Sequence, residues 1–256
     1  MMNNSTFLKI SATALACAAL MACGGGTDTG GGGTTVPVTP VISTASKLAD
    51  AQGFWGATLS ATISASAIIL PNGQAWVVYQ TGTTVTALAQ ATLSLNGSTY
   101  ASSGKYYSLP AGAVQDYSFS GNLTPGGSAT LANSVTVGSG TPAAVTWSYN
   151  KSYETPVSQS SVQGRWSGKL GADSLLWDVD AAGKLAGTST TGCTYSGSIT
   201  PNVNPVAVLD VSMIESCAGA TKTLAGIATL NAAKTGLSIA YTTGAGALAG
   251  VVAVFK

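Results

Sequence analysis

The sequence contains no histidine and few charged residues, with 10 lysines and arginines against 9 aspartates and glutamates. Without histidine, a Ser-His-Asp or Cys-His catalytic arrangement is excluded, and the commonest general base of enzymes is missing. The near-zero net charge argues against nucleic acids and anionic lipid headgroups as partners, because both attract basic surfaces. We therefore predict a protein that is not an enzyme, with no catalytic residue, no cofactor and no nucleic-acid partner.

Long apolar runs are also missing, apart from one near the start of the chain. Residues 10–22 are rich in alanine, leucine and methionine and follow Lys9, the single charged residue of the first 22. This run is too short for a transmembrane helix, and its position behind a positive charge is typical of a secretory signal. The sequence predicts a signal peptide over residues 1–22.

The end of that segment, Leu20-Met21-Ala22-Cys23, resembles the lipobox of bacterial lipoproteins. The resemblance implies that Cys23 is lipidated and that the protein is anchored to a membrane through its acyl chains. Glycine rather than aspartate follows Cys23, which in that family favours the outer membrane. Residues 23–46 continue as a Gly/Thr/Pro-rich linker that acts as a tether. The alternative is an ordinary signal peptide with an incidental cysteine.

Cysteine is scarce in the rest of the chain, where Cys193 and Cys217 are the remaining pair. In an oxidising envelope compartment, two leftover cysteines most simply form one disulfide. The alternative is a metal site, but two thiols without any histidine make a poor zinc site. We predict the disulfide and no metal.

Glycine turns and alternating apolar residues recur through the remaining sequence and predict an all-β fold. Pro71-Asn72-Gly73, for example, supplies the positive φ angles that tight hairpins need. The motif Gln52-Gly53-Phe54-Trp55 returns about 110 residues later as Gln163-Gly164-Arg165-Trp166. We predict two tandem antiparallel up-and-down β-barrel-like modules of about eight strands each, over residues 47–156 and 157–256. The pattern leaves a closed barrel and a sandwich as alternatives.

The second module carries the fuller motif, from Gln163-Gly164-Arg165-Trp166 through the hairpin of residues 176–188 to Tyr195-Ser196-Gly197. This run resembles the opening of avidin-type and lipocalin-type barrels, the calycin pattern. The resemblance implies that Trp166, and by analogy Trp55, closes one end of a barrel. The layout is also similar to the barrel lobes of transferrin-binding lipoproteins and factor-H-binding proteins, a likeness of architecture alone.

The carboxylates give only a weak functional signal. Asp178 and Asp180 point to one face of a strand, and with Gly183 they are similar to the start of a calcium loop that lacks its later ligands. We favour a role in solvating a hairpin and its turn. Asp210 and Glu215 are interpreted as surface or turn groups.

Aromatic residues are the remaining candidates for binding, and they concentrate in the first module. Tyrosine and tryptophan offer large amphipathic contact surfaces. The candidate ligand-binding residues are Trp76, Tyr79, Tyr106 and Tyr107. The alternative is ordinary cross-strand packing within a sheet.

Three functions remain open at this point. The first is a non-enzymatic envelope lipoprotein that binds a protein or other macromolecule at or near the outer membrane surface. The second is a calycin-like carrier that holds a small apolar ligand in an unfilled barrel. The third is a structural or inhibitor lipoprotein that faces the periplasm.

Overall fold

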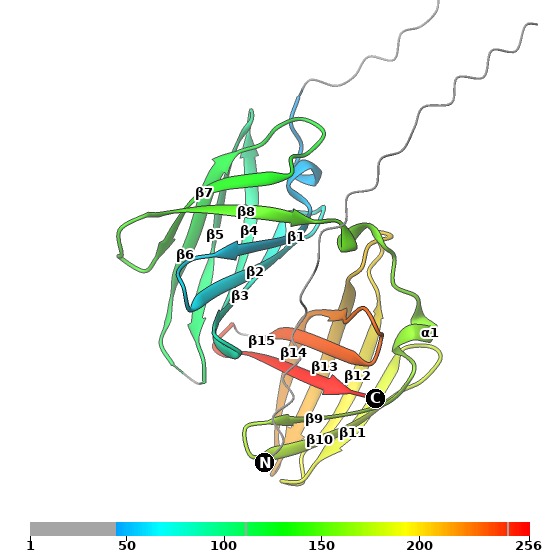
Figure 1. Cartoon of the computed structure of the whole chain (residues 1–256). Coiled ribbons are helices and arrows are strands. Elements are labelled where there is room, and N and C mark those ends of the chain that lie inside the picture. The colour runs from blue at the N-terminus through cyan, green and yellow to red at the C-terminus, as the bar shows by residue number, and fades with distance from the viewer. Residues whose placement is uncertain (1–44, 111, 245) are drawn as a thin grey trace, which may run out of the picture. The chain divides into compact units, whose positions relative to one another are not determined.

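The computed structural model describes residues 45–256 except residues 111 and 245, and these form strands joined by turns and three short helical segments (Figure 1). The predicted signal peptide 1–22, the lipidation site Cys23 and nearly all of the linker 23–46 lie outside the described residues. None of the helices within the described part has the length and hydropathy that a membrane-spanning helix requires.

Eight strands form the first barrel, in which each strand pairs with its neighbour in sequence and β1 pairs with β8 to close the sheet. The strands are β1 (Gly53–Thr58), β2 (Ile63–Ile69), β3 (Gln74–Thr81), β4 (Thr84–Asn96), β5 (Thr99–Ser108), β6 (Val114–Asn122), β7 (Thr130–Val137) and β8 (Ala143–Asn150).

The second barrel repeats this topology and closes between β9 and β16. Its strands are β9 (Gly164–Leu170), β10 (Asp173–Val179), β11 (Lys184–Ser189), β12 (Thr194–Pro201), β13 (Leu209–Cys217), β14 (Ala220–Leu230), β15 (Gly236–Thr243) and β16 (Ala249–Phe255). The predicted all-β class with two antiparallel eight-stranded modules is confirmed, and both modules are closed barrels rather than sandwiches. One barrel lies within residues 47–156 and the other within 157–256.

A glycine turn fixes the second hairpin of each barrel. Gly73 and Gly183 both have φ of 85°, a left-handed conformation that favours glycine. A Cβ atom on Gly73 would also lie 3.0 Å from the carbonyl oxygen of Leu93, and one on Gly183 would lie 2.8 Å from that of Ile199. The backbone N–H of Leu93 donates to the carbonyl oxygen of Gly73 at 2.9 Å, and that of Ile199 donates to the carbonyl oxygen of Gly183 at 2.8 Å. The two turns are therefore structurally equivalent.

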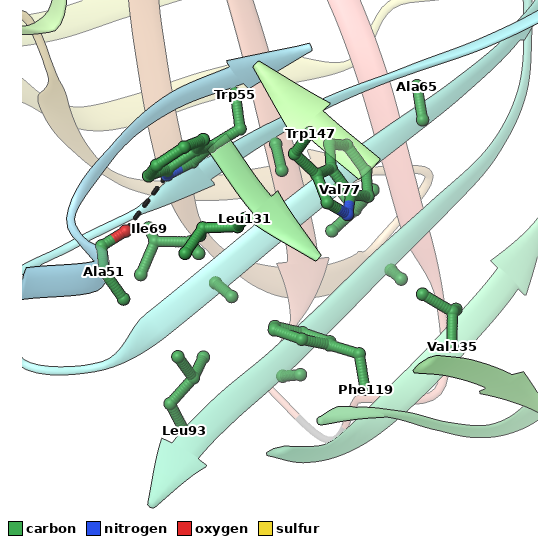
Figure 2. Close-up of a cluster of buried hydrophobic side chains, with 14 of the residues drawn as sticks. Ala51, Trp55, Ala65, Ile69, Val77, Leu93, Phe119, Leu131, Val135 and Trp147 are labelled. Atoms are coloured by element: carbon green, nitrogen blue, oxygen red, sulfur yellow. Dashed lines mark hydrogen bonds between the residues drawn. The ribbon is translucent and has the colours of Figure 1, made fainter. Parts of the chain in front are cut away.

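Each barrel is closed at one end by a helical turn and a tryptophan. The 3₁₀ turn η1 (Leu48–Ala51) precedes β1, and the single turn α1 (Gln159–Val162) precedes β9. The indole of Trp55 donates to the carbonyl oxygen of Ala51 at 3.0 Å, as Figure 2 shows. The indole of Trp166 donates to that of Val162 at 2.7 Å. Both tryptophans lie in the barrel cores.

The sequence does not indicate the helical turn at residues 159–162. Its residues, Gln-Ser-Ser-Val, lack an apolar stripe, and the segment looks like a polar linker. Val162 is nevertheless fully buried in the core of the second barrel. Burial of this one side chain and the hydrogen bond from Trp166 hold the turn in place.

The interiors of the two barrels are separate apolar cores with different compositions. The first contains several aromatic side chains, among them Tyr100 and Tyr117, and Phe119 and Trp147, which are drawn in Figure 2. The second is mainly aliphatic, and Trp166 and Trp177 are its largest buried members. The inward and outward alternation along each strand explains how short sequences with few long apolar runs still fill both cores.

The predicted disulfide is present between Cys193 and Cys217. It joins the chain just before β12 to the last residue of β13, at the end of the second barrel that lies opposite the helical turn α1. The loop that it closes has a sequence separation of 24 residues. In the chain-entropy model, a loop of this size contributes roughly 3 kcal/mol to stability.

Candidate functional site

The four candidate aromatic residues do not form one site. Tyr79 and Tyr106 pack against the core of the first barrel, whereas Trp76 belongs to a different apolar cluster. Tyr107 alternates with Tyr106 along β5, so its side chain points to the outer face. The structure therefore separates the candidates into an inner pair and an outer pair.

The inner pair belongs to a tyrosine cluster near the end of the first barrel that lies opposite η1. The hydroxyls of Tyr79 and Tyr117 are hydrogen-bonded at 2.9 Å, and the ring of Tyr106 lies 5.6 Å from that of Tyr79 and 6.4 Å from that of Tyr117. Burial raises the pKa of Tyr79 to about 12 and raises that of Tyr117 further. These groups stay neutral at physiological pH and fill the barrel.

The outer pair is buried rather than open to a ligand. Trp76 is 3 % exposed and lies in an apolar cluster with Leu88 of β4 and Ile227 of β14. Tyr107 is also 3 % exposed, and its hydroxyl donates to the carbonyl oxygen of Gly246 at 3.0 Å. The packing interpretation of the aromatic residues therefore describes their contacts better than a shared ligand site does.

In the second barrel, one diagonal row of paired residues leads from the tryptophan plug to the disulfide end. The registers pair each member with the next across six neighbouring strands. The row consists of Trp166, Trp177, Gly187, Tyr195, Glu215 and Lys222. Directly paired residues share a face of the sheet, so this row follows the inner face and ends at the exposed Lys222.

Glu215 is the unexpected member of this row. The sequence places it with Asp210 among surface or turn groups, but the structure places it inside β13, opposite Tyr195 on the inner face. Its carboxylate accepts a hydrogen bond from the Tyr195 hydroxyl at 3.0 Å and lies 3.5 Å from the ammonium of Lys222. The surface interpretation of Glu215 is therefore wrong, because the register of β13 turns this residue inward.

The other acidic residues have structural partners. Asp180 accepts backbone N–H groups of Ala182 and Lys184 at 2.9 and 2.8 Å, which stabilises the hairpin turn. Asp178 forms an exposed ion pair with Arg165 at 3.2 Å. Both contacts agree with the hairpin interpretation. Asp210 accepts a hydrogen bond from the amide of Asn202 at 2.7 Å.

The interior of each barrel is filled by its own side chains. The cavity in the first barrel has a volume of about 10 Å³ and lies among Trp55, Tyr117 and Trp147. The cavity in the second, also about 10 Å³, lies among Trp177, Tyr195 and Glu215. Each has room for about one water molecule. The indole nitrogen of Trp177 is buried without a protein partner, and it is a group that such a water would satisfy.

No family model, curated protein or solved structure matches the chain.

The loop between β12 and β13 presents the most exposed large apolar side chain of the described residues. Val203 lies in this loop and is 91 % exposed. The backbone around it is held by Asn202, which donates its N–H to the carbonyl oxygen of Val208 at 3.0 Å and accepts the N–H of Asn204 at 3.0 Å. Val206 of the same loop is buried in an apolar cluster. A fixed loop thus displays an apolar residue to solvent.

Proposed function

We propose that the protein is a non-enzymatic lipoprotein of the bacterial outer membrane that binds a macromolecule through the outer surface of its barrels. The observation that carries this proposal is the filling of both barrels by their own side chains. A carrier of a small apolar ligand needs an unfilled cavity, typically of several hundred Å³. Binding is therefore best assigned to loops and outer faces, where a protein or other large partner can make contact.

The loop of residues 202–208 is the best-supported contact region on that surface. An exposed apolar residue on an ordered loop loses little conformational entropy when a partner covers it. Val203 meets both conditions, because it is almost fully exposed and its neighbours Asn202 and Asn204 fix the loop. We place the centre of the binding surface at Val203.

Membrane attachment is supported by the order of segments along the sequence. An apolar segment ends in Leu20-Met21-Ala22-Cys23, and a Gly/Thr/Pro-rich stretch follows before the first barrel. Such a stretch would hold the folded part away from a lipid anchor at Cys23. The glycine after Cys23 favours the outer membrane as the destination.

A calycin-like origin of both modules is part of the proposal. It is supported by the repeated arrangement of a helical turn, a glycine of positive φ and a plugging tryptophan, seen at Gly53 and Trp55 and again at Gly164 and Trp166. The absence of histidine from the sequence and the pairing of Cys193 with Cys217 support a role without catalysis.

Protease treatment of intact cells tests the location. We expect the full-length chain to be digested on intact cells if it faces outward, with a lysed sample as control. A Cys23→Ser variant should leave the membrane fraction, because the acyl anchor is lost. Membrane retention of this variant would contradict lipid anchoring, and protection on intact cells would contradict the outward-facing form of the proposal.

A photo-crosslinking amino acid tests the binding surface. We expect crosslinks to a partner on living cells when it replaces Val203, and none when it replaces Ser118, an exposed residue on β6 of the first barrel. A Val203→Asp variant that carries the photo-crosslinking amino acid at the neighbouring position 204 should lose the crosslink while keeping its fold. Equal crosslinking from both positions would overturn the assignment of the surface to this loop.

A further inference from the structure

Three metal-ligating side chains converge at the disulfide end of the second barrel. The Sγ atoms of Cys193 and Cys217 and a carboxylate oxygen of Glu215 lie within 4.8 Å of one another. Within the described residues, this is the cluster in which three such donors come together. In the structure the two sulfurs are joined to each other, so they are not free to bind an ion.

We propose that the dithiol form of the chain binds one thiophilic divalent cation, such as Zn²⁺, through Cys193, Glu215 and Cys217. Cysteine enters every newly made chain as a thiol, so this form precedes the disulfide without any reductant. Each cysteine that ligates the ion releases its thiol proton to solvent, and the carboxylate supplies a third ligand. Two sulfurs and one oxygen leave one position of a tetrahedral ion for solvent.

The backbone already holds the two cysteines at a suitable separation. Their Cα atoms are 4.4 Å apart, a distance typical of directly opposed residues in a non-hydrogen-bonded antiparallel pair. With Zn–S distances of about 2.3 Å, tetrahedral coordination needs sulfurs about 3.8 Å apart. Once the S–S bond is absent, rotation about χ1 separates the sulfurs by this amount while the strands stay paired at Tyr195 and Glu215.

A neighbouring hydroxyl orients one of the three ligands. The hydroxyl of Tyr195 donates to the Glu215 carboxylate at 3.0 Å. Such a second contact fixes the orientation of a metal ligand. The ammonium of Lys222 opposes a cation, but its side chain is 52 % exposed and can turn to solvent.

Metal binding and the disulfide are alternatives in this proposal. Formation of the disulfide removes two electrons from the two sulfurs and needs an oxidant, such as the disulfide of an oxidoreductase. That oxidant takes up the electrons and protons and becomes a dithiol, while the new S–S bond releases the ion. The oxidised protein should therefore bind no thiophilic ion at this place.

Metal titration of the full chain tests the proposal. In a Cys17→Ser, Cys23→Ser background, Cys193 and Cys217 are the remaining cysteines. The protein is reduced with a phosphine and desalted without oxygen. It is then titrated with Cd²⁺, followed by thiolate-to-metal absorption, and with Zn²⁺ against a chromophoric chelator. We expect one equivalent to bind to the dithiol form and none to the disulfide form.

Two carboxylate variants separate a built site from loose thiols. Glu215→Gln should weaken Zn²⁺ binding at least tenfold. Glu154→Gln is the matched control, because Glu154 also accepts a tyrosine hydroxyl, that of Tyr149 at 2.9 Å, but lies in the 3₁₀ turn η2 (Lys151–Glu154) after the first barrel. This control should bind as the parent does. Equal affinity in both variants would overturn the three-ligand site, and so would binding by the dithiol form no tighter than that of a Cys193→Ser, Cys217→Ser variant.

Discussion

The two barrels share a frame but fill it in opposite ways. In the second barrel, the row that begins at the plug places Trp177 next and Gly187 beside it. The corresponding row of the first barrel places Ala67 and Val77 at these positions. A Cβ atom on Gly187 would lie 2.2 Å from the ring of Trp177, so the large residue requires the glycine. The frame is fixed by plugs and turns, whereas the interior volume can be supplied from different strands.

The same rows differ at their far ends. The registers place Tyr106 in the first barrel at the position that Glu215 has in the second. Tyr106 joins a cluster of tyrosine rings, whereas Glu215 pairs with Tyr195 and Lys222. One barrel thus ends in neutral aromatic groups and the other in a carboxylate beside a disulfide. The chemical difference between the modules is concentrated at this end.

Removing the plugs should give the largest effect and tests whether the frame is common to both barrels. We expect Trp55→Ala and Trp166→Ala each to lower the free energy of unfolding by about 3–5 kcal/mol, because each leaves a cavity and loses an indole hydrogen bond. Urea unfolding followed by near-UV circular dichroism measures both. Trp55→Phe and Trp166→Phe, which keep most of the volume, should cost less. A loss below about 1 kcal/mol in either alanine variant would contradict a common plug.

Replacing core residues of the second barrel with those of the first should have an intermediate effect on the free energy of unfolding. Gly187→Val alone should cost about 1–3 kcal/mol, because the added side chain overlaps the ring of Trp177. The double variant Trp177→Ala, Gly187→Val installs the residues of the first barrel, and its loss should be at least about 1 kcal/mol smaller than the sum of the two single losses. A double-mutant cycle in urea measures this coupling. Strict additivity would show that the two positions do not share one space.

The smallest effect concerns the tyrosine end of the first barrel. Tyr79→Phe should cost about 1 kcal/mol, because it leaves the buried Tyr117 hydroxyl without its partner. The raised pKa of Tyr79, about 12, also gives a pH dependence. Neutral Tyr79 stabilises the fold fully below pH about 10, the unfolded pKa, and this contribution is lost as the pH rises towards 12.

Unfolding curves between pH 9 and 12 measure this dependence. The parent should lose stability over this range more steeply than Tyr79→Phe. Glu154→Gln serves as a comparison at a hydrogen bond outside the cluster, since it replaces the carboxylate that accepts from Tyr149 with a neutral amide. Identical slopes for the parent and Tyr79→Phe would contradict burial of an ionisable Tyr79.

Local sequence patterns were enough to predict the frame of the fold. Gly73 specifies its hairpin through a positive φ angle, whereas Asn72 does not adopt one, and the spacing from glycine to tryptophan at Gly53 and Gly164 marks each plug. Side chains alternate between the two faces of β3, so Trp76 lies on the opposite face from Val77 and Tyr79. Val77 and Tyr79 belong to the core of the first barrel, whereas Trp76 belongs to a different apolar cluster. These features depend on a few neighbouring residues, so the chain reveals them without any knowledge of tertiary contacts.

The placement of the candidate site residues could not be obtained in this way. Glu215 faces inward because the register, counted from the turn at Gly183 across β12, places it opposite Tyr195. Trp76 and Tyr107 are buried by partners more than 100 residues away, Ile227 and Gly246. Such contacts depend on pairings and packing between distant segments, and no periodicity in a single strand indicates them.

Closure has a consequence for how each barrel folds. In β4–β5 the register runs over ten residue pairs, whereas the closing pairs β1–β8 and β9–β16 comprise three and two. All other pairings within the barrels join strands that follow each other in sequence. Sequence-local hairpins form quickly, whereas contacts between chain segments about 90 residues apart require the closure of a long loop. The hairpins between consecutive strands should therefore form first. The short pairings β1–β8 and β9–β16 should form last, and their amide hydrogens should exchange first in native-state hydrogen exchange.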